Sequence, residues 1–400
     1  MITMRSRSKR AMALLADAAL SAMAPMLVGR GGAERKRIPP SPRVLLVRCD
    51  HIGDAVMATS VLRPLRESLR PATLDVLAGP WAASVFEAHP SVDNVLTVAA
   101  PWWTAARSEE GTRASERQGL RPWMDLLGVV HRIRKERYDV GIDLRGDLRH
   151  IVFFLVLGGI GARISSDRTG GRRLLTRVWP HDASLHEVEK DFAIASLLGA
   201  TGDPRLDVAA PGRLSNGLDS VLSDAMSCGY AALALEASEG KRGWPVARAA
   251  ALVESLHEEF GLRCVFVGSA ADVPAGDALV ALAGPRVVNL AGRTSLPELL
   301  MIFRNAAVSI AVDSGPMHLA AAAGSPVVAL FGPGDPRQSR PWSNEAAVVS
   351  NGSPCGCANS WCEFTNGPGR CMRAIDPGAV VEAVRGLARR TAAGQDAADG

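Results

Sequence analysis

Residues 43–54 read RVLLVRCDHIGD. The first six residues are a short apolar run that is entered from a proline-rich turn, which predicts a buried strand. A loop with Gly53 follows, and residues 54–69 predict a helix with Asp54 at its start. This strand, loop and helix form the unit that the rest of the chain repeats.

The same alternation of strands and helices recurs in both halves of the chain. Further strands are predicted at residues 74–78, 92–96, 139–144, 231–235, 263–267, 287–290, 308–312 and 327–331. Further helices are predicted at residues 80–88, 245–260, 296–305, 316–323 and 378–390. Such alternation predicts parallel sheets with right-handed crossovers. Residues 101–122 break the rhythm, and we interpret them as a mobile insertion over the sheet, with Trp102 and Trp103 as loop anchors or as contacts to acceptor or lipid.

Two domains are expected because single hydrophobic cores seldom grow beyond about 250–300 residues, and this chain has 400. Pro204, Pro211, Gly212 and Gly217 collect near the predicted boundary. The predicted division is a basic leader at 1–40, α/β domains at 41–212 and 213–390, and a disordered tail at 391–400.

The composition is that of an ordinary globular protein, with 47% hydrophobic and 22% charged residues. Forty-five basic residues exceed 41 acidic ones, for a net charge of +4. This excess is too weak to indicate a nucleic-acid partner, which needs clustered positive charge. A mildly basic cleft still suits an anionic substrate.

The first 40 residues place basic side chains before an Ala/Leu/Met-rich stretch at 11–28, in the manner of a signal peptide. Asp17 interrupts the stretch, and Pro25 follows the position where cleavage would occur. Two interpretations remain open, a basic amphipathic helix on a membrane surface and a poorly ordered leader. No other segment is long and apolar enough for a membrane span, so the body is expected to be soluble.

The loop after the first strand carries Asp50, His51, Gly53 and Asp54. A carboxylate here can accept a proton from an attacking hydroxyl group. Alternatively, Asp54 is the N-cap of the following helix, and Asp50 and His51 stabilise the loop. These residues show no spacing typical of a metal site.

Residues 312–318 read VDSGPMH, between a predicted strand and a helix. Asp313 or Ser314 can cap the helix, and Gly315 allows close approach of a ligand. The free N–H groups of a helix N-terminus suit a pyrophosphate, to which His318 could add a hydrogen bond. The alternative for His318 is a partly buried helix residue. A second turn, FGPGDP at residues 331–336, brings Asp335 to the same sheet edge.

A third stretch, GKRGWP at residues 240–245, places Lys241 and Arg242 where a helix begins. Positive charge is unfavourable there unless an anion is bound; the alternative is a solvated basic turn. The chain has no Walker-type loop, no Gly-x-Gly-x-x-Gly after the first strand and no Gly-x-Ser-x-Gly elbow.

Four of the seven cysteines, Cys355, Cys357, Cys362 and Cys371, fall within seventeen residues. Their irregular spacing leaves a structural metal, free thiols and a conditional disulfide open. The odd total argues against a fully disulfide-bonded protein.

The ordered set of motifs resembles glycosyltransferase family 9, the lipopolysaccharide heptosyltransferases. The matching segments are Val44–Val47 with Gly53-Asp54, Tyr138–Gly146, His186–Glu189, Asp313–His318, Gly332–Pro336 and Cys371-Met372. They span about residues 43–390 in the family's order.

The resemblance implies a GT-B fold, with two facing Rossmann-like domains that bind acceptor (41–212) and nucleotide sugar (213–390). It implies inverting transfer without a metal or other cofactor. Asp54 would be the general base, and Asp313, Ser314, Gly315 and His318 would hold the donor diphosphate. Lys241 and Arg242 compete for the family's cation before Trp-Pro, because Gly243 is an extra residue here. Asp272 is the candidate for the family's ribose-binding acid.

The expected reaction moves heptose from ADP-heptose to a lipid-linked lipopolysaccharide core acceptor. It is expected in the cytoplasm, with peripheral association at the inner face of the cytoplasmic membrane. The alternatives are transfer from another nucleotide sugar and a non-catalytic nucleotide-sugar-binding protein of envelope assembly. A nicotinamide-dependent oxidoreductase is disfavoured, because the first loop lacks the glycine fingerprint.

Overall fold

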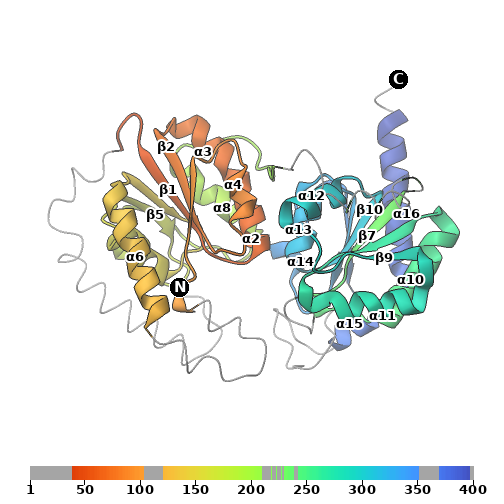
Figure 1. The fold of residues 1–400 in the computed structure, drawn as a ribbon. Coiled ribbons are helices and arrows are strands. Elements are labelled where there is room, and N and C mark those ends of the chain that lie inside the picture. The colour runs from red at the N-terminus through yellow and green to blue at the C-terminus, as the bar shows by residue number, and fades with distance from the viewer. Residues whose placement is uncertain are drawn as a thin grey trace. The chain divides into compact units, whose positions relative to one another are not determined.

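The computed structural model describes residues 38–102, 120–209, 218, 222, 227, 229–237, 242–350 and 369–396. The chain divides into two compact units, Met1–Arg205 and Leu206–Gly400, which are drawn in Figure 1. Each unit is built around one sheet with helices packed on it, and each is described by itself.

The N-terminal unit holds a six-stranded sheet in the order β3-β2-β1-β4-β5-β6. The strands are β1 (Arg43–Arg48), β2 (Thr73–Ala78), β3 (Asn94–Thr97), β4 (Val140–Asp143), β5 (Ala162–Ser166) and β6 (Arg177–Trp179). The helices are α2 (Ile52–Ala58), α3 (Leu62–Leu69), α4 (Ser84–Glu87), α6 (Arg121–Glu136), α7 (Leu148–His150) and α8 (Glu187–Ser196), with a π-helical segment at Ile151–Val156 and short turns at Thr59–Val61 and Arg172–Leu174. Every pairing in the sheet is parallel.

The C-terminal unit repeats this plan with the order β12-β11-β10-β7-β8-β9. The strands are β7 (Tyr230–Ala234), β8 (Arg263–Phe266), β9 (Val287–Asn289), β10 (Val308–Val312), β11 (Val327–Phe331) and β12 (Ala346–Ser350). The helices are α10 (Val246–Phe260), α11 (Val273–Ala283), α12 (Leu296–Arg304), α13 (Gly315–Ala322), α14 (Pro336–Ser339), α15 (Arg370–Ala374) and α16 (Pro377–Asp396), with turns at Ala270–Asp272 and Gly284–Arg286. Its pairings are also all parallel.

The two sheets have the same topology. In each unit the first strand lies in the middle, its second and third strands follow on one side, and its last three follow on the other. This is the Rossmann order, in which the chain reverses direction across the sheet next to the first strand. The predicted α/β class with two Rossmann-like parallel sheets is therefore confirmed.

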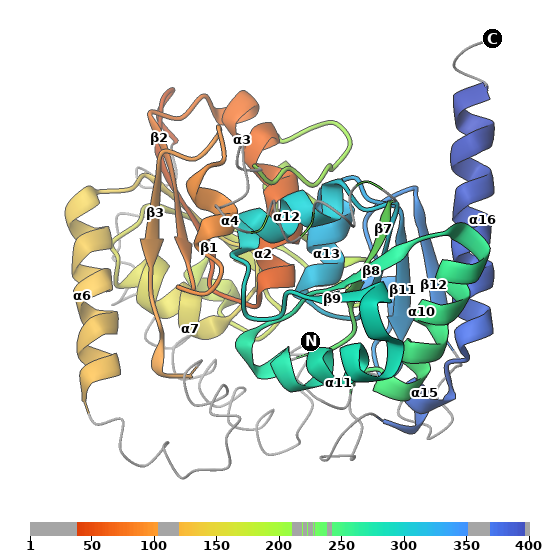
Figure 2. The same cartoon turned by 45° about the vertical axis from the view of Figure 1, so that its right-hand side comes forward.

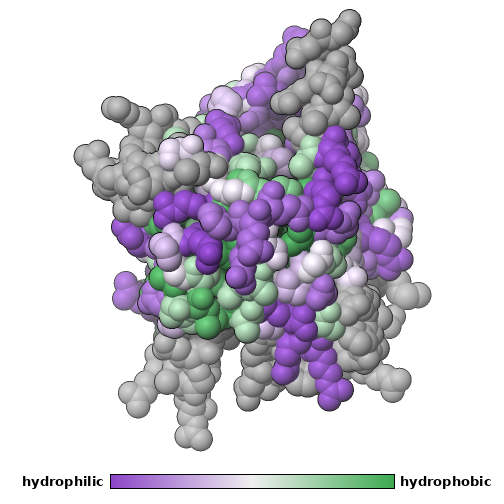
Figure 3. Space-filling view, turned by 90° about the vertical axis from the view of Figure 1, so that its right-hand side faces the viewer, coloured by the Kyte–Doolittle hydropathy of each residue, from purple (hydrophilic) through white to green (hydrophobic). Residues whose placement is uncertain are grey.

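The central strands are buried because helices cover both faces of a parallel sheet. In β1, Val44, Leu45, Leu46 and Val47 have no exposed surface, and β10 is equally buried. Figure 3 shows the C-terminal unit from outside, where hydrophilic side chains are interspersed with apolar ones, as on most protein surfaces. Among the described residues, no helix combines the length and the apolar character that a membrane crossing requires.

Several predicted boundaries differ from the structure. The helix predicted at 54–69 is divided into α2 and α3 by a turn in which the Thr59 and Ser60 hydroxyls donate to the Val56 and Met57 carbonyls. The region at 101–122 already contains the start of α6, while residues 103–119 lie outside the described residues. α16 continues to Asp396, beyond the predicted helix end at residue 390.

Candidate functional site

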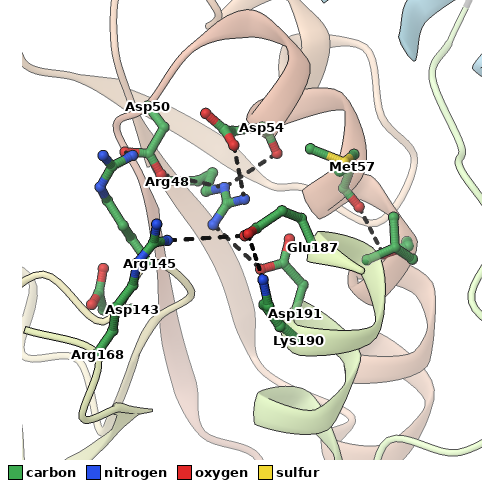
Figure 4. A network of polar contacts seen from close by, with 12 residues as sticks. Arg48, Asp50, Asp54, Met57, Asp143, Arg145, Arg168, Glu187, Lys190 and Asp191 are labelled. Atoms are coloured by element: carbon green, nitrogen blue, oxygen red, sulfur yellow. Dashed lines mark hydrogen bonds and ion pairs between the residues drawn. The ribbon is translucent and has the colours of Figure 1, made fainter. Parts of the chain in front are cut away.

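The end of β1 places one buried cation among three carboxylates. Arg48, the last residue of the strand, lies 3.3 Å from Asp191, 3.5 Å from Asp50 and 3.6 Å from Asp54 (Figure 4). Burial alone would lower the pKa of Arg48, but the charges of the three carboxylates raise it above its ordinary value. The guanidinium therefore stays charged and holds this cluster together.

The three carboxylates differ in exposure. The side chains of Asp191 and Asp50 are 0% and 1% exposed, whereas that of Asp54 is 23% exposed. Burial raises the pKa of Asp191 well above its usual range, although Arg48 acts in the opposite direction. Of the three, only Asp54 is therefore open to a substrate.

The conformation of Asp54 comes from the start of α2. His51 is the N-cap residue, and its backbone N–H donates to Asp54 Oδ2 at 3.2 Å. The alternative that Asp54 itself is the N-cap is therefore wrong, because Asp54 lies one turn further in. Gly53, in the first turn of α2, is buried. The capping contact fixes one carboxylate oxygen, and Arg48 lies beside the other.

A second cation reaches the cluster from the loop after β4. Arg145 forms an ion pair with Asp50, and the Asp50 carbonyl accepts a 2.6 Å hydrogen bond from the Trp81 indole. β1 and β4 flank the point where the strand order reverses, the usual position of a ligand in such sheets. The cluster therefore occupies the expected binding edge.

Buried polar contacts hold the loop that carries Arg145. Asp143, at the end of β4, accepts hydrogen bonds from Ser165 Oγ at 2.9 Å and from the Asp147 backbone at 3.1 Å, and lies 3.0 Å from His150 Nδ1. Burial would lower the pKa of His150, but the contact with Asp143 and the charge of Asp147 raise it. This buried network gives the loop a fixed geometry.

Helix α8 and the loop after β5 add charges that the sequence did not single out. Lys190 lies 2.7 Å from Glu187, and Arg168 lies 4.0 Å from the same carboxylate. Figure 4 shows Arg145, Arg168 and Lys190 grouped around the cluster of Arg48. The motif at His186–Glu189 was the available signal, but nothing in its pattern indicates which charged residues face the loop of Asp54.

In the C-terminal unit, the corresponding strand reversal joins the loops after β7 and β10. Arg242 Nη1 lies 3.4 Å from Asp313 Oδ2 and donates to the Asp313 carbonyl at 3.3 Å. Ser339 Oγ donates to Asp313 Oδ1 at 3.5 Å. The structure thus brings Arg242 and Asp313 together, while Lys241 lies outside the described residues.

The start of α13 is the predicted anion site. Ser314 is the N-cap residue, but its hydroxyl donates backwards to the Val312 carbonyl at 3.1 Å and does not cap the helix. Pro316 has no N–H and the Met317 N–H donates to the Ser314 carbonyl at 3.2 Å, so Gly315 supplies the first-turn N–H that this side chain leaves unsatisfied. His318, one turn in, is buried. The predicted Asp313–His318 group is thus one local structure at the carboxyl edge of β10.

The other residues predicted on the donor side are Asp335 and Asp272, and each makes contacts within its own turn. Asp335 is the N-cap of α14, and its hydrogen bond with Arg337 lowers its pKa. Asp272 accepts hydrogen bonds from the Ser269 backbone and hydroxyl. Glu236, which follows β7, was missed; burial and the charge of Asp272 raise its pKa to about 7. Carboxylates therefore follow both β7 and β8 at this edge.

The described residues contain no group of three or more His, Cys, Asp or Glu side chains that could hold a metal ion. Cys371 is buried in α15. Cys355, Cys357 and Cys362 lie outside the described residues, so the predicted alternatives for the cysteine cluster stay predictions.

Comparison with known proteins adds a family match. The sequence model of glycosyltransferase family 9 (heptosyltransferase) matches residues 127–364, more than half of the chain. Lipopolysaccharide heptosyltransferase 2 of Salmonella typhimurium is 28% identical over 331 residues, which cover 77% of this chain and 87% of the relative.

Solved structures agree on the fold. ADP-heptose lipopolysaccharide heptosyltransferase II of Escherichia coli aligns with a TM-score of 0.65 and 23% identity, over 87% of this chain and 99% of its own. A family 9 glycosyltransferase of Veillonella parvula aligns with a TM-score of 0.70 and 18% identity, over 88% and 98%.

Proposed function

Because the chain belongs to glycosyltransferase family 9, we propose that it transfers heptose from ADP-heptose to a lipopolysaccharide core acceptor. It is an enzyme of the glycosyltransferase class. The heptosyltransferase relative supports the sugar, and the ADP-heptose enzyme of similar fold supports the nucleotide. The observation that carries the catalytic assignment is the exposure of Asp54 beside the buried Arg48.

Asp54 acts as the general base. Its carboxylate takes the proton of the acceptor hydroxyl, while the hydroxyl oxygen uses an electron pair to form the bond to the anomeric carbon of the heptose. The bond from that carbon to the diphosphate oxygen breaks, and ADP leaves with its electron pair. A carboxylate used only as a base implies a single displacement with inversion at the anomeric carbon.

Arg48 and His51 act by positioning Asp54. The guanidinium lies beside Oδ1, and the His51 backbone N–H donates to Oδ2, so both carboxylate oxygens have a fixed neighbour. A general base must lie within hydrogen-bond reach of the proton that it accepts. This two-sided support keeps Asp54 in one orientation as an acceptor approaches.

The donor diphosphate binds at the start of α13. A helix N-terminus attracts anions, the Gly315 N–H lies at this one, and the Arg242 guanidinium lies against Asp313 at the same edge. His318 supplies a further donor. These groups stabilise the negative charge that develops on departing ADP, and we propose that they replace a metal ion in this role.

The acceptor binds through the cations near Asp54. Arg145 and Arg168 offer positive charge for acidic groups of a core oligosaccharide, and Arg145 reaches the cluster directly through Asp50, while the buried Lys190 pairs with Glu187 beside them. Guanidinium groups recognise carboxylates and phosphates in two-point contacts. Because this acceptor is lipid-linked, we place the reaction in the cytoplasm at the inner face of the cytoplasmic membrane.

The donor assignment is tested by thermal stabilisation of the full chain with ADP, UDP, GDP and their sugars. ADP and ADP-heptose should raise the melting temperature selectively, since a ligand that binds the folded state stabilises it by mass action. Asp313→Asn should reduce the ADP shift, whereas Asp203→Asn, an exposed position in the other unit, should not. Selective stabilisation by a UDP- or GDP-sugar would refute ADP-heptose as donor and leave the transferase class intact.

A further inference from the structure

The first two turns of α6, with the residue before them, expose large apolar side chains to solvent. Leu120, Trp123, Met124 and Leu127 are 76%, 45%, 67% and 56% exposed. In the described part of the chain, the other exposed large hydrophobic residues are Leu282 and Val348, both in the C-terminal unit. An apolar group of this kind on one helix is typical of an interaction site, whereas scattered single residues need no explanation.

These side chains form a stripe separate from the face that packs on the domain. Leu126, Val130 and Ile133 point into the core and anchor the helix. With about 100° of rotation per residue, Leu120, Met124 and Leu127 lie on an adjoining face. Figure 2 shows α6 at the outer edge of the N-terminal unit. The stripe is therefore presented outward by a helix that is firmly held.

Basic residues extend this face of α6 toward the C-terminal end of the helix. Arg134 and Lys135 follow the apolar stripe at helical spacing and are exposed. Residues 120–137 contain five Lys or Arg residues against two acidic ones, one of which, Glu136, pairs with Arg43. Arg121 adds a cation at the helix start, where positive charge is unfavourable unless an anion is near. The surface therefore combines an apolar stripe with cations around it.

Aromatic residues form the base of the stripe. The inner side of Trp123 contacts Trp102 and Phe153, with ring centroids 6.4 and 6.3 Å apart. The Arg149 guanidinium lies over the Trp102 ring at 5.1 Å. Tryptophan is enriched where one side of a surface is apolar and the other wet, as at a membrane interface.

We propose that this docking surface, comprising Leu120, Trp123, Met124 and Leu127 with the basic turns that follow, rests on a bilayer of anionic phospholipid. The apolar side chains enter the boundary between headgroups and acyl chains, and the cations contact lipid phosphates. The charge of the face favours this occupant over a neutral protein groove. The inference extends the proposed lipid-linked acceptor, because it names the surface that brings the enzyme to it, but its test needs no sugar substrate.

The test measures co-sedimentation of the full chain with vesicles that contain no glycolipid. One set is phosphatidylcholine alone, and the other is phosphatidylcholine and phosphatidylglycerol in equal amounts. The variant Leu120→Gln/Met124→Gln/Leu127→Gln changes exposed positions only, and glutamine is a good helix former. The matched control is Leu282→Gln/Val348→Gln, which makes the same kind of change on the other unit.

Wild type and control should bind the anionic vesicles at least about tenfold more tightly than the triple variant. Binding should weaken with salt and be lower on neutral vesicles. Trp123 fluorescence, obtained as the difference between wild type and Trp123→Phe, should be quenched by brominated lipid.

Equal vesicle binding by wild type and triple variant would overturn the proposal. So would a triple variant that loses a self-associated form in light scattering while its vesicle binding is unchanged, because the stripe would then bind a second copy. Circular dichroism and an unchanged melting temperature are the check that the triple variant is folded. Neither vesicle contains donor or acceptor, so vesicle binding tests this surface whether or not the proposed transfer reaction is confirmed.

Discussion

Replacing Arg48 should destabilise the N-terminal unit far more than replacing its closest acidic partner. In Arg48→Met, Asp191 and Asp50 remain buried, and Asp191 loses the cation at 3.3 Å. Removing one partner of a buried ion pair costs about 3–5 kcal/mol, because the other charge is left uncompensated. We expect a loss of this size for Arg48→Met.

Asp191→Asn should cost only about 1 kcal/mol, the size of one hydrogen bond. Arg48 keeps Asp50 at 3.5 Å and Asp54 at 3.6 Å in this variant, so its charge is still balanced. Arg48→Met should therefore lower the free energy of unfolding several times more than Asp191→Asn, although both substitutions remove the same contact.

Urea unfolding followed by circular dichroism measures both effects. Two units can unfold in separate transitions, so each midpoint is fitted by itself. A loss of about 4 kcal/mol lowers a midpoint by about 2 M if the slope is near 2 kcal/mol per molar. The transition of the C-terminal unit should not move. A loss below about 1 kcal/mol for Arg48→Met, or equal losses for both variants, would refute the view that one cation organises this cluster.

Three further predictions concern the C-terminal unit. Arg242→Gln should weaken ADP binding about 10- to 100-fold in calorimetry, because a charge-assisted hydrogen bond is lost; an unchanged Kd would exclude this residue from the diphosphate site. Gly334→Ala should also weaken ADP binding, by about tenfold, because a Cβ there would lie 2.3 Å from Asp313 Oδ2 and displace it; normal binding would show that Asp313 need not be held there. The pKa of Glu236 is raised from 4.5 to about 7, so the stability that it contributes is present below the lower value and is lost as pH rises through the higher one. The melting temperature of this unit should fall across that window in wild type but not in Glu236→Gln, and identical pH profiles would contradict the shift.

The fold was predictable where strands are apolar, buried and flanked by clear turns. β1, β10 and β11 have the predicted bounds, because runs such as VVALF leave little ambiguity. β5, β6 and β12 were missed: β5 is buried but alternates apolar residues with Arg163, Ser165 and Ser166, β6 has three residues, and β12 lies at the sheet edge with much of its length exposed. Short strands that are polar or partly solvated lack the continuous apolar signal.

Helix α6 was missed although signals for it were present. Its first turn contains Pro122, and Leu126, Val130 and Ile133 have helical spacing. The insertion predicted at residues 101–122, on the basis of its tryptophans and charged residues, includes only the first two residues of α6. No element was predicted for the rest of this helix, although its apolar spacing is helical.

The sequence predicted which loops form the candidate site, but not which residues contact one another there. Strand ends in a parallel sheet meet at one edge, so Asp54 and Asp313 could be singled out from the chain alone. The ion pair of Arg48 with Asp191 joins residues far apart in sequence and depends on how α8 packs against α2 and β5. The contact between Arg242 and Asp313 likewise depends on which strands become neighbours. Such pairings need the assembled sheet.

The most direct test of the account compares turnover of ADP-heptose by wild type, Asp54→Asn and Asp203→Asn on a core acceptor that lacks heptose. ADP affinity is measured on the same preparations by calorimetry. We predict that Asp54→Asn lowers kcat at least about a hundredfold and leaves the Kd for ADP unchanged, while Asp203→Asn behaves as wild type. Near-normal turnover by Asp54→Asn would contradict the assignment of the general base and, with it, the proposed mechanism.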